Sequence, residues 1–341
     1  MKYFFFLLII TSSNLMFGQT REVELIQILD TVISKSKEIS YYTKTVNWDS
    51  LSNKMYIAAK GAKKIDDLKP AFEILLNGLR DHHGMIRQSS NGKIIAHFSD
   101  YKNKRIKNKR EYSSENWKIV NDVNSRYEYA LLPNQIGYLK IVGIGPNIDG
   151  QKEAERIRNS LTELCENKVN KWIIDLRYNG GGNINVMLAG IAPLLDTKTV
   201  VQIQDANKDL LFTGNIKKNS FWYAGLNVHK MGKKPKIKNP KIAILTSRWT
   251  TSSGEFVAVA FKGQKNTKFF GEPTEGKTTN NSWEIINNEI ALVISTGVYC
   301  DRNANVYVEN VKPDKEVAFE MEENKEKDKG VIEAVDWLNE K

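Results

Sequence analysis

A serine lies where a strand-like run gives way to an apolar helix. Residues 241–245 (KIAIL) predict a buried strand, residues 250–255 read TTSSGE, and residues 256–261 (FVAVAF) continue as a helix. Backbone N–H groups and the dipole at a helix N-terminus favour negative charge, which acyl transfer requires because its tetrahedral intermediate carries an oxyanion. Ser252 is therefore a candidate nucleophile. The structural alternative is a capping box, Ser252-x-x-Glu255, which any helix can use.

A second strand-to-helix junction carries three consecutive glycines, at residues 175–182 (DLRYNGGG). Glycine allows the backbone to adopt positive φ and to approach a ligand closely. The N–H groups of this turn could therefore supply the other half of an oxyanion hole. The alternative is a permissive turn between a strand and a helix, and the residues alone leave both readings open.

A third segment, residues 271–278 (GEPTEGKT), formally satisfies the phosphate-loop pattern. That pattern should open a helix, whereas residues 279–286 predict a turn and then a strand. Nucleotide binding at Gly271–Thr278 is accordingly the weaker reading. Lys277 has another possible use, because a lysine desolvated in a site can act as a general base for a serine. The plain alternative is a surface lysine.

Two adjacent histidines, His82 and His83, follow the end of a predicted helix. Histidine is the commonest general base near neutral pH, and a histidine near the helix C-terminal dipole is the structural alternative. Adjacent side chains face different directions, so we expect no metal site here. Two cysteines, Cys165 and Cys300, are too few for a Cys-based zinc site; an exported protein could pair them, which the sequence does not decide.

The elements that carry these residues follow a simple order. Residues 19–84 predict an N-terminal helical bundle from apolar residues at helical spacing, and residues 85–134 predict a mixed connector with a basic loop at 102–110. Residues 135–318 alternate short apolar strands with helices, which predicts an α/β core with a largely parallel sheet. A polar tail and a short helix occupy residues 319–341.

The first 18 residues predict a secretory signal peptide. Lys2 precedes an apolar run at residues 3–10, and the run is too short to span about 30 Å of hydrocarbon. We therefore expect cleavage near Gly18, export to the periplasm or the extracellular space, and no stable membrane anchor afterwards. The net charge is +10, but the basic residues are not interleaved with aromatic ones, so we expect no nucleic-acid partner.

The three motifs, in this order and at these junctions, resemble those of the S41 peptidases. This family includes the carboxyl-terminal processing (tail-specific) proteases and the core of the tricorn protease. The resemblance covers roughly residues 135–315, with a weaker echo at 76–87. It implies a crotonase-like core, a peptide or protein substrate, and acyl transfer without a metal or cofactor. It also implies that Ser252 is the nucleophile and that Gly181 or Gly182, with the N–H of Ser253, forms the oxyanion hole.

The resemblance offers two general bases. Lys277 matches the base of the processing proteases, whereas residues 79–83 (LRDHH) resemble the D-x-H segment of the tricorn-like branch. In that branch His83 would be the base and Glu309 its orienting carboxylate, although Glu309 is displaced by one position from the pattern. The two alternatives stay open. The family often inserts a PDZ module, but the interval between His83 and the strand at residue 136 is too short for one, so none is expected.

A second class of function also remains. Some relatives on this fold bind ligands without cleaving them, so the chain could be an inactive S41-fold protein that binds a peptide or a hydrophobic ligand. Ser252, the candidate bases and the glycine turn argue against that reading.

Overall fold

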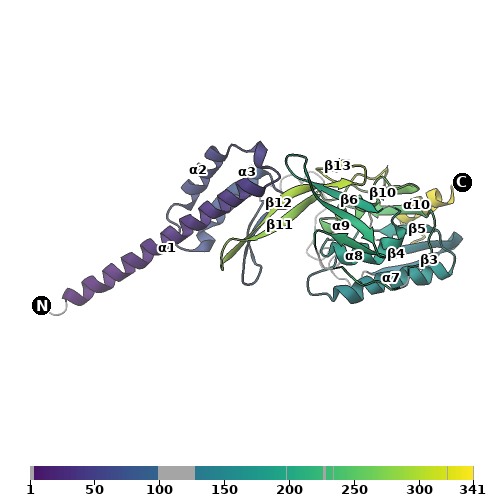
Figure 1. Ribbon diagram of the computed structural model, residues 1–341, viewed down its shortest axis with the longest axis horizontal. Coiled ribbons are helices and arrows are strands. Elements are labelled where there is room, and N and C mark those ends of the chain that lie inside the picture. The colour runs from purple at the N-terminus through teal and green to yellow at the C-terminus, as the bar shows by residue number, and fades with distance from the viewer. Residues whose placement is uncertain are drawn as a thin grey trace. The chain divides into compact units, whose positions relative to one another are not determined.

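The computed structural model describes residues 4–98, 127–196, 198–225, 228–232, 234–320 and 322–340, with side chains from residue 21 onward (Figure 1). The chain forms two compact units. The first takes its described residues from 4–98 and 280–297, and the second from 127–279 and 298–340. The predicted basic loop at 102–110 lies outside the described residues.

Three helices make up most of the first unit: α1 (Phe4–Ile39), α2 (Trp48–Ala59) and α3 (Lys69–Leu79), with 3₁₀ turns at Thr43–Thr45 and Ile65–Leu68. Asn47 caps α2, its side chain accepting from the N–H of Ser50 at 3.0 Å. Pro70 lies in the first turn of α3, where its missing N–H costs nothing. Within the described residues no helix has the length and apolar character needed to cross a membrane.

These helices pack against strands of their own unit. Strand β1 (Met85–Gln88) pairs antiparallel with β2 (Ile94–His97) and with the first part of β12 (Ile290–Asp301). One apolar cluster joins Leu29 and Phe72 from the helices to Ile86 and Leu292 from the strands. The predicted N-terminal helical bundle is therefore not confirmed, because strand residues cover part of the helices' apolar faces.

A six-stranded sheet forms the centre of the second unit, in the order β14 (Lys315–Glu316), β10 (Thr267–Gly271), β9 (Lys241–Thr246), β5 (Lys171–Asp175), β4 (Ile136–Lys140) and β3 (Glu128–Leu132). All neighbours pair in parallel except β3, which runs antiparallel to β4. Its central strands are buried on both faces, as parallel strands in α/β proteins are. The predicted α/β class is confirmed.

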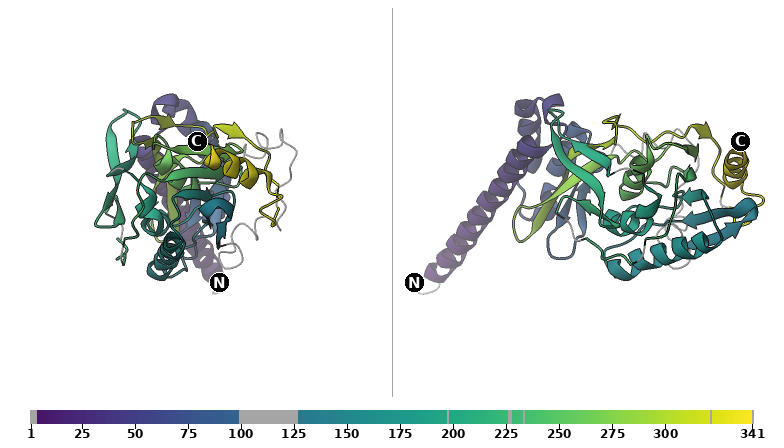
Figure 2. Two further views of the ribbon diagram at one scale, coloured as in Figure 1. Left: turned by 90° about the vertical axis from the view of Figure 1, so that its right-hand side faces the viewer. Right: turned by 45° about the vertical axis from the view of Figure 1, so that its right-hand side comes forward.

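Helices cover both faces of this sheet (Figure 2). Helices α7 (Gly150–Glu166), α8 (Ile184–Ile191) and α9 (Ser253–Phe261) share one apolar cluster with Ile174 and Ile244. Helix α10 (Lys329–Asn339) packs on the other face, in a cluster with Ile173 and Leu245. Neighbouring strand residues thus point to opposite layers, as the pleat requires.

The second unit also contains an antiparallel sheet, which the sequence did not predict. It comprises β6 (Thr199–Gln204), β7 (Leu210–Lys217), β8 (Ser220–Tyr223), β13 (Val306–Tyr307) and the last part of β12. Short loops at residues 205–209 and 218–219 join β6, β7 and β8, and short hairpins can connect only antiparallel strands. The expectation of a largely parallel core therefore describes one of the two sheets.

Candidate active site

The three sequence motifs follow three adjacent parallel strands, β5, β9 and β10. In the sheet register, Asp175 lies opposite Leu245, which lies opposite Phe270. The chain after each of these strands therefore emerges at the same edge. In α/β sheets the crevice beyond the carboxyl ends of the strands is where ligands bind. The fold accordingly gathers the glycine turn, the Ser252 segment and the Lys277 segment at one place in the second unit.

Ser252 adopts a strained backbone at the N-cap of α9. Its φ is 53° and its ψ is −117°, a combination that non-glycine residues rarely adopt. Its N–H donates to Oε2 of Glu255 at 2.9 Å, so the glutamate half of the predicted capping bond is present. Strain of this kind is concentrated at functional sites, where surrounding bonds hold it in place. A plain helix cap would not need it.

The glycine turn lies directly against Ser252. Gly181 and Gly182 both have positive φ, at 95° and 105°. A Cβ added to Gly181 would lie 3.1 Å from the Cβ of Ser252, and one added to Gly182 would lie 1.9 Å from the carbonyl oxygen of Ile144. Any side chain at Gly182 would therefore displace the backbone of residue 144, and glycine is required there for both space and conformation.

The two glycine amides differ in their partners. The N–H of Gly181 donates to Oδ1 of Asn179 at 3.0 Å, so it is already used inside the turn. The N–H of Gly182 makes no hydrogen bond within the described residues, because the bridge to Ile144 uses the carbonyl of Gly181 and the N–H of residue 183. Ser253 is the first residue of α9, where the helix itself offers its N–H no acceptor. Gly182 and Ser253 are thus the pair suited to hold an oxyanion.

Glu255 is the residue that joins the Ser252 segment to the Lys277 segment. Its buried carboxylate accepts from Ser252 N at 2.9 Å, Lys277 N at 2.8 Å, Gly276 N at 2.8 Å and the Thr274 hydroxyl at 2.5 Å. The first two donors share Oε2, so the backbones of Ser252 and Lys277 are neighbours. The sequence revealed Glu255 only as a cap, because its other partners lie in a different loop.

Burial raises the pKa of the Glu255 carboxyl, and the hydrogen bonds from Thr274, Gly276, Ser252 and Lys277 oppose this rise. Since all four partners are donors, the ionised form is the one that can satisfy all of them. Burial likewise raises the pKa of Glu275, against the attraction of the Lys277 ammonium, whose Nζ lies 3.2 Å from Glu275 Oε1. The site therefore contains two buried carboxyl groups: Glu255 binds the backbone N–H of Lys277, and Glu275 pairs with its ammonium.

The tricorn-like candidates are divided between the units. His83 lies in the first unit, just after α3, where its N–H donates to Oδ1 of the buried Asp81 at 3.1 Å and its carbonyl accepts from Asn281. Glu309 lies in the second unit with an exposed side chain. Its carbonyl lies beside the Lys277 loop, since a Cβ on Gly276 would be 2.3 Å from Glu309 O. Within its own unit, Ser252 is thus accompanied by Lys277 and Glu309.

The remaining candidate sites have structural explanations. The segment after Thr278 is strand β11 (Thr279–Ile285), so the helix that a phosphate loop should open is not there. Cys165 and Cys300 are both free thiols, and burial raises the pKa of each to about 11. In the described part of the chain, no three His, Cys, Asp or Glu side chains are grouped to hold a metal ion.

The chain is similar in sequence to a known family and to known proteins. The model of peptidase family S41 matches residues 135–317. A nisin-resistance protein from Lactococcus lactis is 33% identical over 150 residues, which is 43% of this chain and 45% of the relative. The chloroplastic carboxyl-terminal-processing peptidase 2 of Arabidopsis thaliana is 27% identical over 145 residues, 42% of this chain and 24% of the relative. The match thus spans less than half of either relative.

Solved structures share the fold at lower identity. A lipoprotein from Streptococcus agalactiae superposes with a TM-score of 0.66 at 21% identity, covering 91% of this chain and 94% of that one. The photosystem II D1 C-terminal processing protease superposes with a TM-score of 0.55 at 14% identity, covering 86% and 93%. The family match covers more than half of the chain and includes the glycine turn, Ser252 and Lys277. The chain therefore belongs to peptidase family S41.

Proposed function

We propose that this chain is an exported serine endopeptidase that hydrolyses peptide bonds through an acyl-enzyme on Ser252. The observation that carries the proposal is the position of the glycine turn, where a Cβ on Gly181 would lie 3.1 Å from the Cβ of Ser252. The N–H groups of Gly182 and Ser253, next to the strained Ser252, are then available to bind an oxyanion. Such pre-placed donors are usually the largest single contribution to acyl-transfer catalysis.

The proposed reaction has two steps. A general base takes the proton of the Ser252 hydroxyl, and the resulting alkoxide attacks the peptide carbonyl carbon. The N–H groups of Gly182 and Ser253 stabilise the oxyanion, and the base returns the proton to the leaving amine as the C–N bond breaks. A water molecule then attacks the ester carbonyl and gives a proton to the base; the bond to the Ser252 oxygen breaks, the base returns that proton to Ser252, and the acyl group leaves as a carboxylic acid.

We propose Lys277, in its neutral amine form, as the general base, with His83 and Glu309 as the alternative pair. The support for Lys277 is its backbone bond to the same Glu255 oxygen that binds Ser252 N. Peptide hydrolysis by Ser252→Ala, Lys277→Ala and His83→Ala, each checked for folding by circular dichroism, tests the assignment. We expect no turnover from Ser252→Ala or Lys277→Ala and retained turnover from His83→Ala. The reverse result for the two bases would make His83 the base.

The substrate class is proposed as a peptide presented outside the cytoplasm. A relative is a nisin-resistance protein, so nisin belongs in a panel with unrelated peptides, with products identified by mass spectrometry. The alternative function, an inactive protein that binds a peptide or hydrophobic ligand, predicts that a fluorophosphonate probe fails to label folded wild-type protein at Ser252. Export through cleavage near Gly18 is tested by N-terminal sequencing of the protein secreted by expressing cells.

A further inference from the structure

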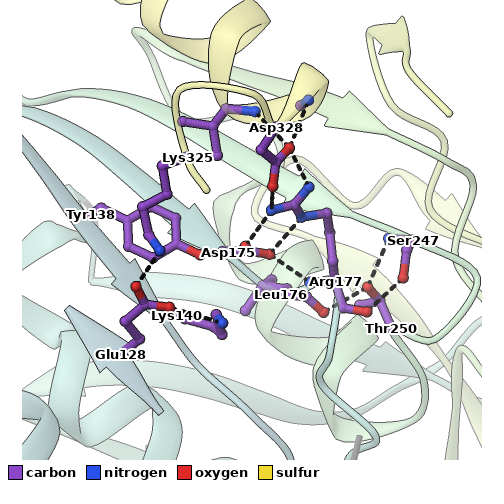
Figure 3. Close-up of polar contacts among 12 residues, drawn as sticks. Glu128, Tyr138, Lys140, Asp175, Leu176, Arg177, Ser247, Thr250, Lys325 and Asp328 are labelled. Carbon is purple, nitrogen blue, oxygen red and sulfur yellow. Dashed lines mark hydrogen bonds and ion pairs between the residues drawn. The ribbon is translucent and has the colours of Figure 1, made fainter. Parts of the chain in front are cut away.

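Arg177, two residues after the end of β5, is a buried cation held by two carboxylates (Figure 3). Its Nε and NH2 donate to Asp175 at 3.0 and 2.7 Å, and its NH1 and NH2 donate to Asp328 at 2.8 and 2.7 Å. Tyr138 OH donates to Asp175 as well, at 2.7 Å. A guanidinium with a bidentate partner on each side is fixed in both position and orientation.

Asp328 connects this cation to the C-terminal helix. It is the N-cap of α10, and its Oδ1 accepts from the N–H groups of Gly330 and Val331 at 2.9 and 3.2 Å. One carboxylate therefore serves both the first turn of α10 and Arg177. Because α10 packs on the sheet through Val331, the carboxylate is held by a rigid element.

The main chain around Arg177 holds the turn that leads to the nucleophile. The Ser247 hydroxyl donates to the carbonyl of Arg177 at 2.6 Å, and the Thr250 hydroxyl donates to the carbonyl of Leu176 at 2.8 Å. The N–H of Ser247 in turn donates to the Thr250 hydroxyl at 3.0 Å. Thr250 directly precedes the Thr251–Ser252 pair, so its position limits where the nucleophile can lie.

The same stretch also fixes the glycine turn. Asn179 is two residues after Arg177; its carbonyl accepts from Thr251 N at 3.0 Å and its Oδ1 accepts from Gly181 N at 3.0 Å. Residues 176–181 therefore bind both the segment before Ser252 and the oxyanion side of the site. A shift of Arg177 would move these two parts of the site together.

We propose that Asp328 is a positioning residue of the peptidase, acting from the C-terminal helix through Arg177 on Ser252 and the glycine turn. The proposal rests on the proposed serine-peptidase function. Removal of the Asp328 charge relaxes one side of the Arg177 guanidinium, so we expect the geometry of acylation to be lost while substrate binding is retained. Displacements of about 1 Å cost up to about 100-fold in rate, so we expect kcat to fall about 10- to 100-fold with little change in KM.

Asp328→Asn is the informative variant. Asparagine caps a helix as well as aspartate does. The substitution therefore removes the negative charge of residue 328 that faces Arg177 and preserves the start of α10. Asp336→Asn, on the exposed side of the same helix, controls for charge. Val331→Ala controls for loosened packing, because Val331 is buried beside the cap in the apolar cluster between α10 and the sheet.

Three measurements on the full chain, below the unfolding temperature of every variant, decide the proposal. These are kcat and KM for peptide hydrolysis, the rate of fluorophosphonate labelling, and hydrogen exchange at the amides of Thr251 and Gly181. Support requires that Asp328→Asn lowers kcat and labelling at least tenfold and accelerates both amides, with Val331→Ala and Asp336→Asn within twofold of wild type.

Equal effects of Asp328→Asn and Val331→Ala, or no effect of either, would overturn the positioning role. Failure of the proposed function looks different, because wild-type protein would then neither hydrolyse peptides nor react with the probe. In that case the exchange rates of Thr251 and Gly181 alone decide whether Asp328 holds these segments in place.

Discussion

Glu255→Gln tests whether the buried carboxylate holds the site together. Glutamine has nearly the same shape, but one of its two terminal atoms donates instead of accepting. The carboxylate of Glu255 receives only donors: Ser252 N and Lys277 N on Oε2, Gly276 N and the Thr274 hydroxyl on Oε1. The glutamine amide must therefore face donors whichever way it turns.

The loss of unfolding free energy depends on which of the two glutamate oxygens the amide nitrogen replaces. Against Oε2 the amide would meet two backbone N–H groups that cannot adapt. Against Oε1 the Thr274 hydroxyl can turn and accept, which leaves the N–H of Gly276 opposed and the Thr274 O–H without its Glu255 acceptor, so this orientation is favoured because only one backbone N–H is opposed. One buried, unsatisfied donor costs about 1–3 kcal/mol, so we expect the unfolding free energy to fall by at least this amount. The Lys277 loop should shift at Gly276, and we expect kcat to fall at least tenfold.

The assay combines urea unfolding with peptide hydrolysis and has a matched control. Glu153→Gln replaces another buried glutamate, on α7, that pairs with Arg156 and lies outside the motif segments. We expect that control to lose stability and keep kcat within twofold. If Glu255→Gln also retains wild-type kcat, Glu255 does not position the catalytic loops and the reasoning fails.

The raised pKa of Glu255 adds a pH test to the same pair of proteins. As the pH falls through this raised value, the carboxyl takes up a proton that faces its four donors, so wild-type kcat should fall on the acid side. That limb should be missing from Glu255→Gln. The stability contribution has the opposite sense: burial favours the protonated form in the folded state, so it is present below about pH 4 and lost as the pH rises through the folded pKa. A common acid limb in both proteins would assign it to another group.

Three further predictions concern the scaffold. Gly182→Ala forces a Cβ to within 1.9 Å of a carbonyl oxygen, whereas Gly145→Ala meets nothing within 4 Å; we expect only the first to abolish hydrolysis and lower the urea midpoint. Arg158 donates to the last carbonyls of α8, so Arg158→Met should cost about 2–5 kcal/mol in urea unfolding, and a loss under 1 kcal/mol would contradict this. Burial disfavours ionised Asp175, but the Arg177 charge together with the hydrogen bonds from Arg177 and Tyr138 outweighs burial and lowers the pKa of Asp175. The stability this pair provides should be present above about pH 4 and be lost as the pH falls through the lowered pKa; urea curves from pH 7 to 2, compared with Asp175→Asn, measure it.

The local residue pattern predicts the helices and strands but not the segments that they pack against or bond to. The helix at residues 150–166 follows from its apolar spacing, and the strand at 241–246 from its continuous apolar run. The apolar run at residues 136–144 favours an extended backbone throughout, yet β4 ends at Lys140 and the N–H of Ile144 donates instead to Gly181 in the glycine turn. An apolar residue reports that it will be buried, and the group that buries it is set by long-range contacts.

The site shows the same division. Ser252, Lys277 and the glycine turn could be named from residue type and position, because each follows a strand. The role of Glu255 could not, since its bonds to residues 274–277 depend on how two loops meet. Arg177 and Asp328 are even further apart in the sequence, and no local pattern around either residue predicts that they form an ion pair.

The bounds of the family match, residues 135–317, differ from the bounds of the structural units. Residues 280–297 belong to the first unit, and Ile290, Leu292 and Ile294 are fully buried there against helices and β1. A fragment limited to residues 135–317 would contain residues 280–297 without the helices and β1 that bury them. It would therefore expose an apolar surface and an unpaired strand edge to other copies. We expect such a fragment to aggregate on expression. By covering these apolar residues, the N-terminal helices protect the family-matched part of the chain from self-association.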